Sequence, residues 1–447
     1  MKLLWRVFYR LYRIVSSIRY WGQRRFTRPG LALAAAFIIA GMMGPDTENT
    51  AAYQGFSLLL GLLLVAIAFT GSFRARFSAE RLLPRFGTVG APLYYTVRLR
   101  NLSARPQPGL TLMDSLADTR PSFEDWLAVR VADERQSRSF RFSDRRRVNP
   151  FKLATLKEAE VPTLPPNQDV GVQVELRPLR RGILRFAGVA LGRPDPLGLF
   201  RAFSRTALPQ TTLILPKRYL LPSIALPGSM KYQQGGVALA SSVGQSDEFI
   251  ALRDYRHGDP PRHIHWRSWA KTGKPVVKEF EDEFFVRHAL VLDTFVDHPC
   301  SEAFEEAISI AASFACSVRT QESLLDLLFV GPQSYAFTAG RGLAHADQML
   351  EVLASVRACA DQPFEKLEHL VINHVRRVSG CICVLVGWDE PRRKFVEKLQ
   401  ALGVPLLVLI VTPPGKAPGL QAFPMREEDR FYVLETGQVE QGLAKLK

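Results

Sequence analysis

The sequence predicts a protein of mixed class, with an N-terminal transmembrane helical hairpin, a small antiparallel β-sandwich and a C-terminal doubly wound α/β domain. Two uncharged apolar stretches predict the hairpin, period-two alternation of side chains predicts the sandwich, and buried strands alternating with helices predict the α/β domain. A chain of 447 residues has room for two or three domains. The expected parts are a basic juxtamembrane segment (1–28), the transmembrane hairpin (29–72), the β-sandwich (73–218), an interdomain segment (219–285) and the α/β domain (286–447).

Basic side chains surround the apolar region. The formal net charge is +15, and the first 30 residues contain eight Lys or Arg and no Asp or Glu. Four more arginines follow the apolar stretches, namely Arg74, Arg76, Arg81 and Arg85. Because Lys and Arg accumulate on the cytoplasmic side of membrane helices, we expect both termini in the cytoplasm, the hairpin in a bacterial inner membrane, and the lipid bilayer as a partner. Residues 3–21 mix aliphatic, aromatic and Arg side chains at helical spacing, which predicts an amphipathic helix on the inner leaflet.

Two segments are candidates for crossing the membrane. Residues 51–71 carry no charge over 21 positions, enough for a helix to cross a hydrocarbon core of about 30 Å. Residues 31–44 are shorter, and the polar sequence PDTENT joins the two segments. A cleaved signal peptide is the alternative, but its apolar core would lie nearer the N-terminus. The five Cys all lie in the last third of the chain and do not resemble a secreted disulfide framework.

The middle of the chain has the pattern of half-buried strands. Residues 92–102 and 170–200 alternate apolar with polar side chains, and a Pro/Gly corner interrupts the second stretch. Such strands predict a small antiparallel sandwich. Residues 115–150 are rich in Arg, Asp and Ser, which predicts a long surface loop.

The pattern changes at residue 287. The apolar run HALVLDTF predicts a strand buried on both faces, and residues 301–320 follow with helical spacing and Ser301 as the N-cap. Further strands and helices alternate to residue 435, which predicts an open α/β sheet with right-handed crossovers. Functional groups gather at the carboxyl ends of strands in such sheets, and Asp293 and Asp389 both follow predicted strands.

Residues 253–280 combine charge with aromatic side chains to an unusual degree. The segment holds seven Lys or Arg, and Arg and Asp are interleaved so that opposite charges can pair. Tyr255, Trp266 and Trp269 offer large surfaces for burial, and residues 258–261 form a Gly/Pro turn. We therefore predict an interdomain clamp, buried between the sandwich and the α/β domain, that presents a surface to a partner.

This segment resembles the signature of the bacterial family called domain of unknown function 58. The signature positions are matched by Phe249, Arg253, Tyr255, Gly258, Asp259, Arg262, Ile264 and Trp266. The stretch RRGILRFAGVALGRPDPLGLF is similar to a second recurring sequence of the family. One position departs from the pattern: the family usually has Asp before the final Trp, and this chain has His265.

The resemblance implies a membrane hairpin before a β domain, and a C-terminal domain that resembles a von Willebrand factor type A domain. It also implies a MoxR-type AAA+ ATPase as partner and brings no established enzymatic activity. Type A domains bind Mg²⁺ through Asp-x-Ser-x-Ser and a later Asp; here only the degenerate set Asp293, Asp297 and Asp389 is available for the ion, together with water. The alternative is that Asp293 and Asp389 cap backbone amides.

Other metal and redox sites have weaker support. His263 and His265 are spaced to suit Zn²⁺, but no nearby pair completes four ligands. Cys381 and Cys383 lie in an apolar strand, where packing explains them.

These patterns favour a membrane-anchored cytoplasmic adaptor or scaffold that works with a AAA+ ATPase or an envelope-assembly partner. No catalysis, small-molecule substrate or resident cofactor is expected, apart from Mg²⁺ at the degenerate site. A metal-dependent hydrolase or nuclease using Asp254 and Asp259 is one alternative. A membrane-tethered nucleic-acid binder drawing on residues 138–147 and 253–278 is another, which the juxtamembrane location of the charge argues against.

Overall fold

The structure is a computed structural model of the 447-residue chain. It describes residues 2–43, 50–73, 75–117, 120–136, 149–222, 249–259, 261–280, 286–298, 300–317, 323–339, 343–415, 426 and 429–446. The chain forms two compact units: residues 1–218 with 296–305 and 350–360, and residues 219–295 with 306–349 and 361–447. The expected PDTENT loop and the Arg-rich stretch 138–147 lie almost entirely outside the described residues.

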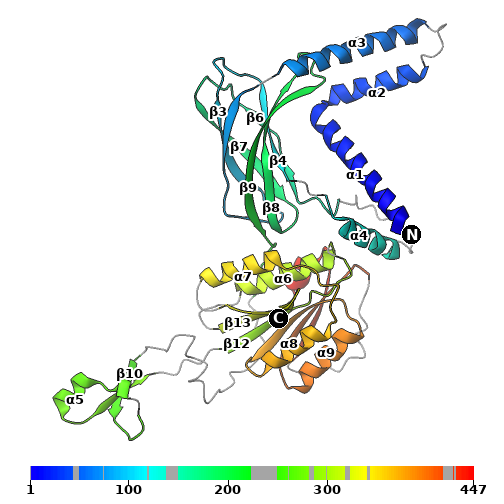
Figure 1. The fold of residues 1–447 in the computed structure, drawn as a ribbon. Helices are drawn as coiled ribbons and strands as arrows, with labels where there is room; N and C mark the ends of the chain where they lie inside the picture. The colour runs from blue at the N-terminus through cyan, green and yellow to red at the C-terminus, as the bar shows by residue number, and fades with distance from the viewer. Residues whose placement is uncertain are drawn as a thin grey trace. The chain divides into compact units, whose positions relative to one another are not determined.

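Three helices open the first unit: α1 (Lys2–Arg25), α2 (Arg28–Met43) and α3 (Thr50–Ser72). Helices α2 and α3 lie side by side (Figure 1), and the rings of Phe37 and Phe56 stack between them at 4.7 Å. Within the described residues, one helix is long and apolar enough to cross a membrane, over Tyr53–Gly71. Helix α2 is also apolar but has only 16 residues.

Two sheets of the first unit face each other around one core. The four-stranded sheet has the order β1-β3-β7-β5 and the five-stranded sheet the order β2-β9-β8-β4-β6. Their strands are β1 (Phe77–Leu82), β2 (Phe86–Thr88), β3 (Leu93–Asn101), β4 (Leu110–Leu116), β5 (Ala154–Leu156), β6 (Ala159–Val161), β7 (Asp169–Pro178), β8 (Gly182–Pro194) and β9 (Arg201–Leu215). All strand pairs are antiparallel except β2 with β9.

Alternation places one side of each strand in the core, as the sequence predicts. In β3 the buried side chains are Tyr95, Val97 and Leu99, with Tyr94 and Arg98 exposed between them. Apolar side chains from both sheets, such as Val174 and Leu191, form a single cluster. The sandwich therefore follows from the period of two that β-strands impose on side chains.

The loop predicted over residues 115–150 is wrong in part, because helix α4 (Phe123–Gln136) occupies its middle. Ser122 Oγ accepts the Asp125 amide at 3.1 Å, which caps the first turn. Trp126 is buried and contacts the rings of Trp5, Tyr9 and Tyr12 on helix α1, at centroid distances of 5.6–6.0 Å. The helix depends on this distant partner, which local composition does not reveal.

The second unit contains a six-stranded sheet in the order β14-β13-β12-β15-β16-β17, parallel except for β14. Its strands are β12 (Val286–Leu292), β13 (Ser323–Val330), β14 (Ser334–Ala339), β15 (Gly380–Val386), β16 (Leu406–Thr412) and β17 (Arg430–Glu435). Its helices are α6 (Glu302–Ser317), α7 (Leu343–Ser355), α8 (Glu365–Val375), α9 (Glu390–Ala401) and α10 (Val439–Leu443).

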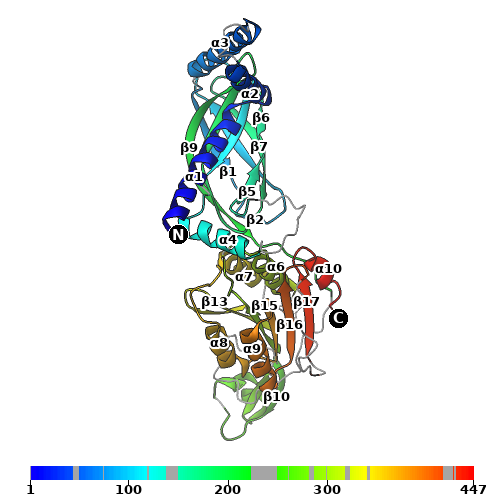
Figure 2. The same cartoon turned by 90° about the vertical axis from the view of Figure 1, so that its right-hand side faces the viewer.

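Helices cover both faces of this sheet, with α6 and α7 on one face and α8 and α9 on the other (Figures 1 and 2). Every residue of β16 is buried, as expected for a strand covered on both sides. Ser301 Oγ accepts the Phe304 amide and α6 begins at Glu302, so the predicted N-cap is confirmed. The same alternation that predicts the strands and helices thus brings Asp293 and Asp389 to the carboxyl ends of β12 and β15.

Candidate functional site

Residues 249–280 form a small folded element, called here the hairpin module. Strand β10 (Phe249–Asp254) pairs antiparallel with β11 (Val276–Phe280), so that Arg253 lies opposite Val277. A short 3₁₀ turn (Pro261–His263) and helix α5 (Trp266–Thr272) lie between the strands. Gly273 ends the helix in the left-handed conformation, at φ +70°.

An ion pair organises the loop that follows β10. Arg253 donates two hydrogen bonds of 2.7 Å to the two carboxylate oxygens of Asp259, and the Arg256 amide donates to Oδ2 at 2.8 Å. Gly258 precedes the acid at φ +110°, where a side chain would strain the backbone. Hydrogen bonds from Arg253 and from the Arg256 amide lower the pKa of Asp259 to about 2. This carboxylate is therefore a fixed anion that closes a loop, rather than a group poised to exchange protons near neutral pH.

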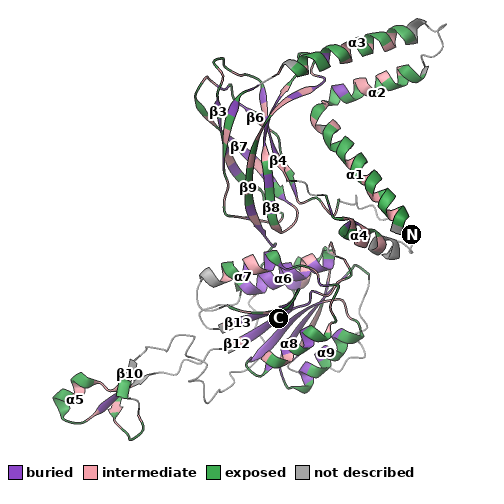
Figure 3. Ribbon diagram, viewed as in Figure 1, coloured by how far each residue is buried: buried purple, intermediate pink, exposed green. Residues whose placement is uncertain are grey.

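The module itself does not bury Trp266, and burial of its aromatic side chains between the two domains stays a prediction. Trp266 is 63% exposed, and Tyr255 and Trp269 are half-buried. Helix α5 is exposed over most of its length (Figure 3). The two Trp rings stack with centroids 5.3 Å apart, because positions 266 and 269 lie on the same face of α5. The flanking segments 223–248 and 281–285 lie outside the described residues, so the interdomain place of the module stays a prediction.

His265, the position at which the chain departs from the expected signature, lies at the N-cap of α5. Its side chain accepts no backbone amide, and Nδ1 lies 2.7 Å from Ser268 Oγ instead. An Asp at an N-cap accepts a backbone N–H of the first turn. The departure from the family pattern thus removes a helix cap and places a titratable ring there.

The other signature positions have structural places in the module. Ile264 bridges to Val277, Arg262 is exposed in the 3₁₀ turn, and Phe249 begins β10 opposite Phe280. Asp254 ends β10 and is exposed. The described part of the chain contains no group of three or more His, Cys, Asp or Glu side chains arranged to hold a metal. His263 lies in the 3₁₀ turn and His265 at the start of α5.

A second polar cluster lies at the carboxyl ends of β12 and β15. Asp293 is fully buried, and the Arg392 guanidinium lies between it and Asp389. Arg392 Nε donates to Asp293 at 2.6 Å, Nη1 to Asp389 at 2.5 Å, and Nη2 to the Phe295 carbonyl at 2.7 Å. Burial alone would lower the pKa of Arg392, but the two carboxylates raise it above its ordinary value. The side chain is thus a permanent cation.

The geometry of this cluster does not fit the predicted Mg²⁺ site. Asp293 Oδ1 accepts the Phe295 amide at 2.9 Å, and Oδ2 accepts the Val386 amide at 2.8 Å besides Arg392. Asp389 is the N-cap of α9 and accepts the Arg392 amide at 3.2 Å. The alternative, that both acids cap backbone amides, is confirmed. A guanidinium therefore supplies the positive charge that a divalent ion would supply. Asp297, the third predicted ligand, follows Asp293 by four residues in the segment after β12.

A third cluster joins the sandwich to the start of α2. The turn over residues 195–200 belongs to the second family-like sequence, and Asp195 accepts the amides of Leu197 and Phe200 at 3.1 and 2.6 Å. Thr27 donates to the Gly198 carbonyl at 2.5 Å through Oγ1 and to the Leu199 carbonyl at 3.1 Å through its amide. The turn therefore holds the N-terminus of α2 through these hydrogen bonds.

Close packing completes this junction. Thr27 Oγ1 also accepts the Gly30 amide at 3.1 Å, which caps α2. A Cβ atom on Gly30 would lie 2.0 Å from the Leu199 carbonyl oxygen, so only glycine allows the approach. Leu199 and Phe200 form a small buried cluster with Ala66 of α3.

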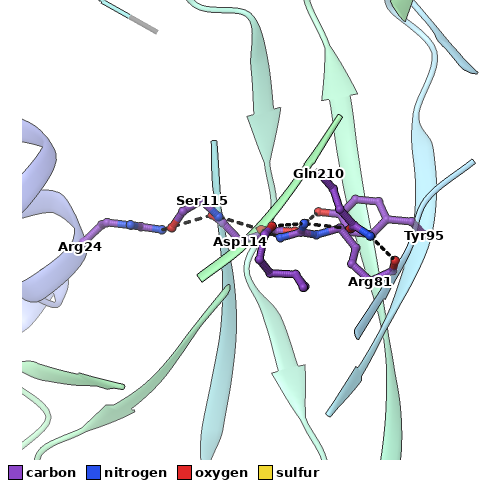
Figure 4. Close-up of polar contacts among 7 residues, drawn as sticks. Arg24, Arg81, Tyr95, Asp114, Ser115 and Gln210 are labelled. Carbon is purple, nitrogen blue, oxygen red and sulfur yellow. Dashed lines mark hydrogen bonds and ion pairs between the residues drawn. The ribbon is translucent and has the colours of Figure 1, made fainter. Parts of the chain in front are cut away.

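The sandwich also contains a buried ion pair, between Arg81 and Asp114 (Figure 4). Arg81 and Asp114 are fully buried and form two hydrogen bonds of 2.6 and 2.8 Å, and Tyr95 donates to Asp114 at 2.7 Å. Burial and the adjacent carboxylate raise the pKa of Tyr95. Arg24 of α1 reaches the same strand, donating to Ser115 Oγ at 2.9 Å and to the Asp114 carbonyl at 3.2 Å. Helix α1 is thus linked to the sandwich through polar side chains.

Sequence reasoning missed Arg392, Thr27 and Gly30. A signal existed for the first, because Asp389-Glu390-Pro391 is a typical helix start and puts Arg392 in the first turn, beside the strand ends. The junction residues lacked such a signal, since Thr27 and Gly30 meet a turn about 170 residues away in the sequence.

Comparison with known proteins identifies part of the chain. Residues 251–406 match the family described as "Protein of unknown function DUF58". This range begins within the hairpin module and extends to the first residue of β16. The uncharacterized protein YeaD of Bacillus subtilis (strain 168) is 27% identical over 194 residues, which cover 43% of this chain and 47% of that protein. The chain thus spans about half the length of this relative.

Solved structures show only distant likeness. A CARDB domain from Pyrococcus furiosus, in complex with di-metal ions, is 12% identical and covers 32% of this chain and 96% of that domain, with a TM-score of 0.18. A cohesin module from a Clostridium perfringens family 33 glycoside hydrolase is 9% identical and covers 32% of this chain and 98% of that module, with a TM-score of 0.17.

Proposed function

We propose that the chain is a membrane-anchored scaffold that binds another protein through the hairpin module. The observation that carries the proposal is the stacked pair of Trp266 and Trp269, with Trp266 63% exposed, on an element held by the pairing of β10 with β11 and by the Arg253–Asp259 ion pair. Ordering a loop costs conformational entropy that this element does not recover by burying its largest side chains. Exposed Trp side chains are typical of the residues that dominate protein interfaces.

The anchor in this proposal is the helix pair α2 and α3, which crosses a bacterial inner membrane twice and leaves both termini in the cytoplasm. Helix α3 has the required length and apolarity, and Phe37 and Phe56 pack α2 against it. Basic residues on the outer ends of the pair, Arg28 on one side and Arg76 on the other, agree with this orientation.

The α/β unit of the scaffold is proposed to resemble a von Willebrand factor type A domain and to work with a MoxR-type AAA+ ATPase or an envelope-assembly partner. Support comes from the family-like signature and from the parallel sheet with Asp293 at the end of β12. Arg392 pairs with Asp293 and Asp389, so we propose recognition through side chains rather than through a metal bridge. Asp259 is paired with Arg253, which favours binding over catalysis as the role of the module.

The experiment is capture of partners by the tagged full chain, solubilised in detergent from its native cells. We expect Trp266→Ala with Trp269→Ala to lower the yield of the main partner about tenfold or more, as loss of an interface hot spot does. The matched control is Tyr94→Ala, another exposed aromatic side chain, located on the sandwich. Equal capture by both variants contradicts the proposal. Binding of DNA or RNA with a steep dependence on salt, lost in the Trp variant, would identify a nucleic-acid binder instead.

A further inference from the structure

Helix α1 has two apolar faces, and only one of them is covered. Trp5, Tyr9 and Tyr12 pack against Trp126 of α4. A second stripe at spacings of three and four residues is more than half exposed at every position; it consists of Leu4, Val7, Leu11, Ile14 and Ile18. An apolar stripe on a helix rich in arginine is typical of helices that lie in the headgroup region of a membrane.

The exposed stripe leads into a groove between the last turns of α1 and strand β9. The groove has a volume of about 540 Å³, and Ile18, Tyr20 and Trp21 form its apolar wall. Sites for small organic ligands typically have volumes of about 300–1,000 Å³. The groove is therefore large enough for a lipid headgroup with the first part of its acyl chains.

Three arginines also line the groove, Arg24, Arg25 and Arg205. Arg24 is held by Ser115 and by the Asp114 carbonyl. Arg25 and Arg205 are exposed and rest near aromatic rings, Arg25 over Trp21 at 5.3 Å and Arg205 over Phe203 at 6.0 Å. Among the described residues, no carboxylate lies within ion-pair distance of either group. A phosphate can accept several hydrogen bonds from each guanidinium that reaches it.

The groove also lies where the chain enters the proposed membrane anchor. Arg25 precedes the first residue of α2 by three positions, and the turn that holds α2 leads directly into β9. Tyr and Trp favour the membrane–water interface, because their rings are apolar and carry a polar O–H or N–H group at one edge. A free anion would use the arginines but not the apolar wall, so the combination specifies a lipid.

We propose that this groove binds the phosphate headgroup and upper acyl chains of an anionic phospholipid. This inference rests on the membrane anchoring proposed above. The bound lipid would fill the space between α1 and the sandwich and fix the α1 helix against the membrane surface. It gives Arg24 and Arg25, two of the six arginines of α1, a specific role beyond general attraction to the bilayer.

The test uses the full chain reconstituted into vesicles of phosphatidylcholine and phosphatidylglycerol in equal amounts. Bromine is placed on the acyl chains of one lipid or the other, and quenching of Trp21 is obtained as the difference between the wild type and Trp21→Phe. We expect brominated phosphatidylglycerol to quench Trp21 more strongly, with each of Arg25 and Arg205 contributing about a fivefold preference for the anionic lipid. Arg25→Gln with Arg205→Gln should remove that preference.

The matched control is Arg10→Gln with Arg13→Gln, which lowers the charge of the chain equally at exposed positions of α1 outside the groove. Retention of the lipid preference in this control supports the groove, and equal loss in both pairs overturns it in favour of unspecific attraction. Equal quenching by the two brominated lipids in the wild type also overturns it. Displacement of the lipid preference by inorganic phosphate would reassign the site to a free anion. Failure of the wild type to insert into vesicles would instead overturn the membrane anchoring.

Discussion

Replacing Gly30 with Ala should separate helix α2 from the turn over residues 195–200. The added Cβ would lie 2.0 Å from the Leu199 carbonyl oxygen and 2.9 Å from its carbonyl carbon, and real Cβ contacts shorter than 3.0 Å are essentially never seen. Both neighbours are backbone atoms, so no side chain can rotate away. The helix or the turn must therefore move by about 1 Å, which a close-packed junction resists.

The magnitude follows from what such a displacement breaks. Overpacking of a filled site costs about 1–3 kcal/mol. The two hydrogen bonds from Thr27 to the Gly198 and Leu199 carbonyls would stretch as well, at about 1 kcal/mol each. We expect Gly30→Ala to destabilise the junction by about 3–5 kcal/mol.

The assay is hydrogen exchange of the full chain in detergent, followed at the amides of Thr27 and Phe200. Both amides are hydrogen-bonded within the junction, to the Leu199 carbonyl and to Asp195 Oδ1. A loss of about 3 kcal/mol corresponds to roughly a hundredfold faster exchange if both amides open with the junction. The matched control is Gly61→Ala, since a Cβ at Gly61 of α3 meets nothing within 4 Å.

Unchanged exchange at Thr27 and Phe200 in Gly30→Ala would refute this reasoning, because it would mean that the junction accepts a methyl group. Equal effects of Gly30→Ala and Gly61→Ala would refute it as well. In that case the cause would be a general response of apolar helices to alanine.

Three further predictions concern stability. His265→Asp should restore an N-cap to α5 and strengthen the helix by about 1 kcal/mol, seen as slower exchange of its first-turn amides; faster exchange would argue against the assigned cap position. Arg81→Met should lower the free energy of unfolding by about 3–5 kcal/mol, because it leaves the Asp114 carboxylate buried without its partner. The double variant Arg81→Met with Asp114→Leu should regain most of the lost free energy of unfolding, measured by denaturant titration. Losses in the double variant that equal the sum of the two single losses would contradict the buried pair. Burial lowers the pKa of His288 from 6.5 to about 4. The unfolded chain therefore binds more protons between these values, and stability should fall by about 2–3 kcal/mol as pH drops from about 7 to about 4.5. His288→Leu should remove that part of the pH dependence, and an unchanged profile would show that other groups cause it.

Sequence patterns predicted those elements whose stability is local or periodic. The continuous apolar run in β12 and the acidic first turn of α6 after Ser301 are sufficient evidence for a buried strand and a capped helix. Helix α4 was missed because Trp126 packs against aromatic rings of α1, more than 100 residues earlier in the chain. Charge and turn chemistry alone made that segment resemble a loop.

In the candidate site too, features that depend on local sequence could be predicted and features that depend on distant contacts could not. The pairing of Arg253 with Asp259 was within reach of the sequence, since the two residues flank a Gly turn and carry opposite charge. The exposure of Trp266 could not be predicted from the sequence, because composition cannot tell whether an aromatic cluster faces the protein or the solvent. The resemblance to type A domains implied a metal ion at Asp293 and Asp389, while the actual counter-charge comes from a side chain that no metal motif includes.

The Arg392 guanidinium between these two acids has a consequence for regulation. An exchangeable ion leaves its site when chelated or scarce, so a protein that depends on one responds to ionic conditions in the cell. A cation that is covalently part of the polypeptide cannot dissociate, and its pKa keeps it charged across the physiological range. The geometry at this edge of the sheet should therefore be constitutive, indifferent to magnesium supply and to chelators, and switchable only by a partner that competes for the arginine itself.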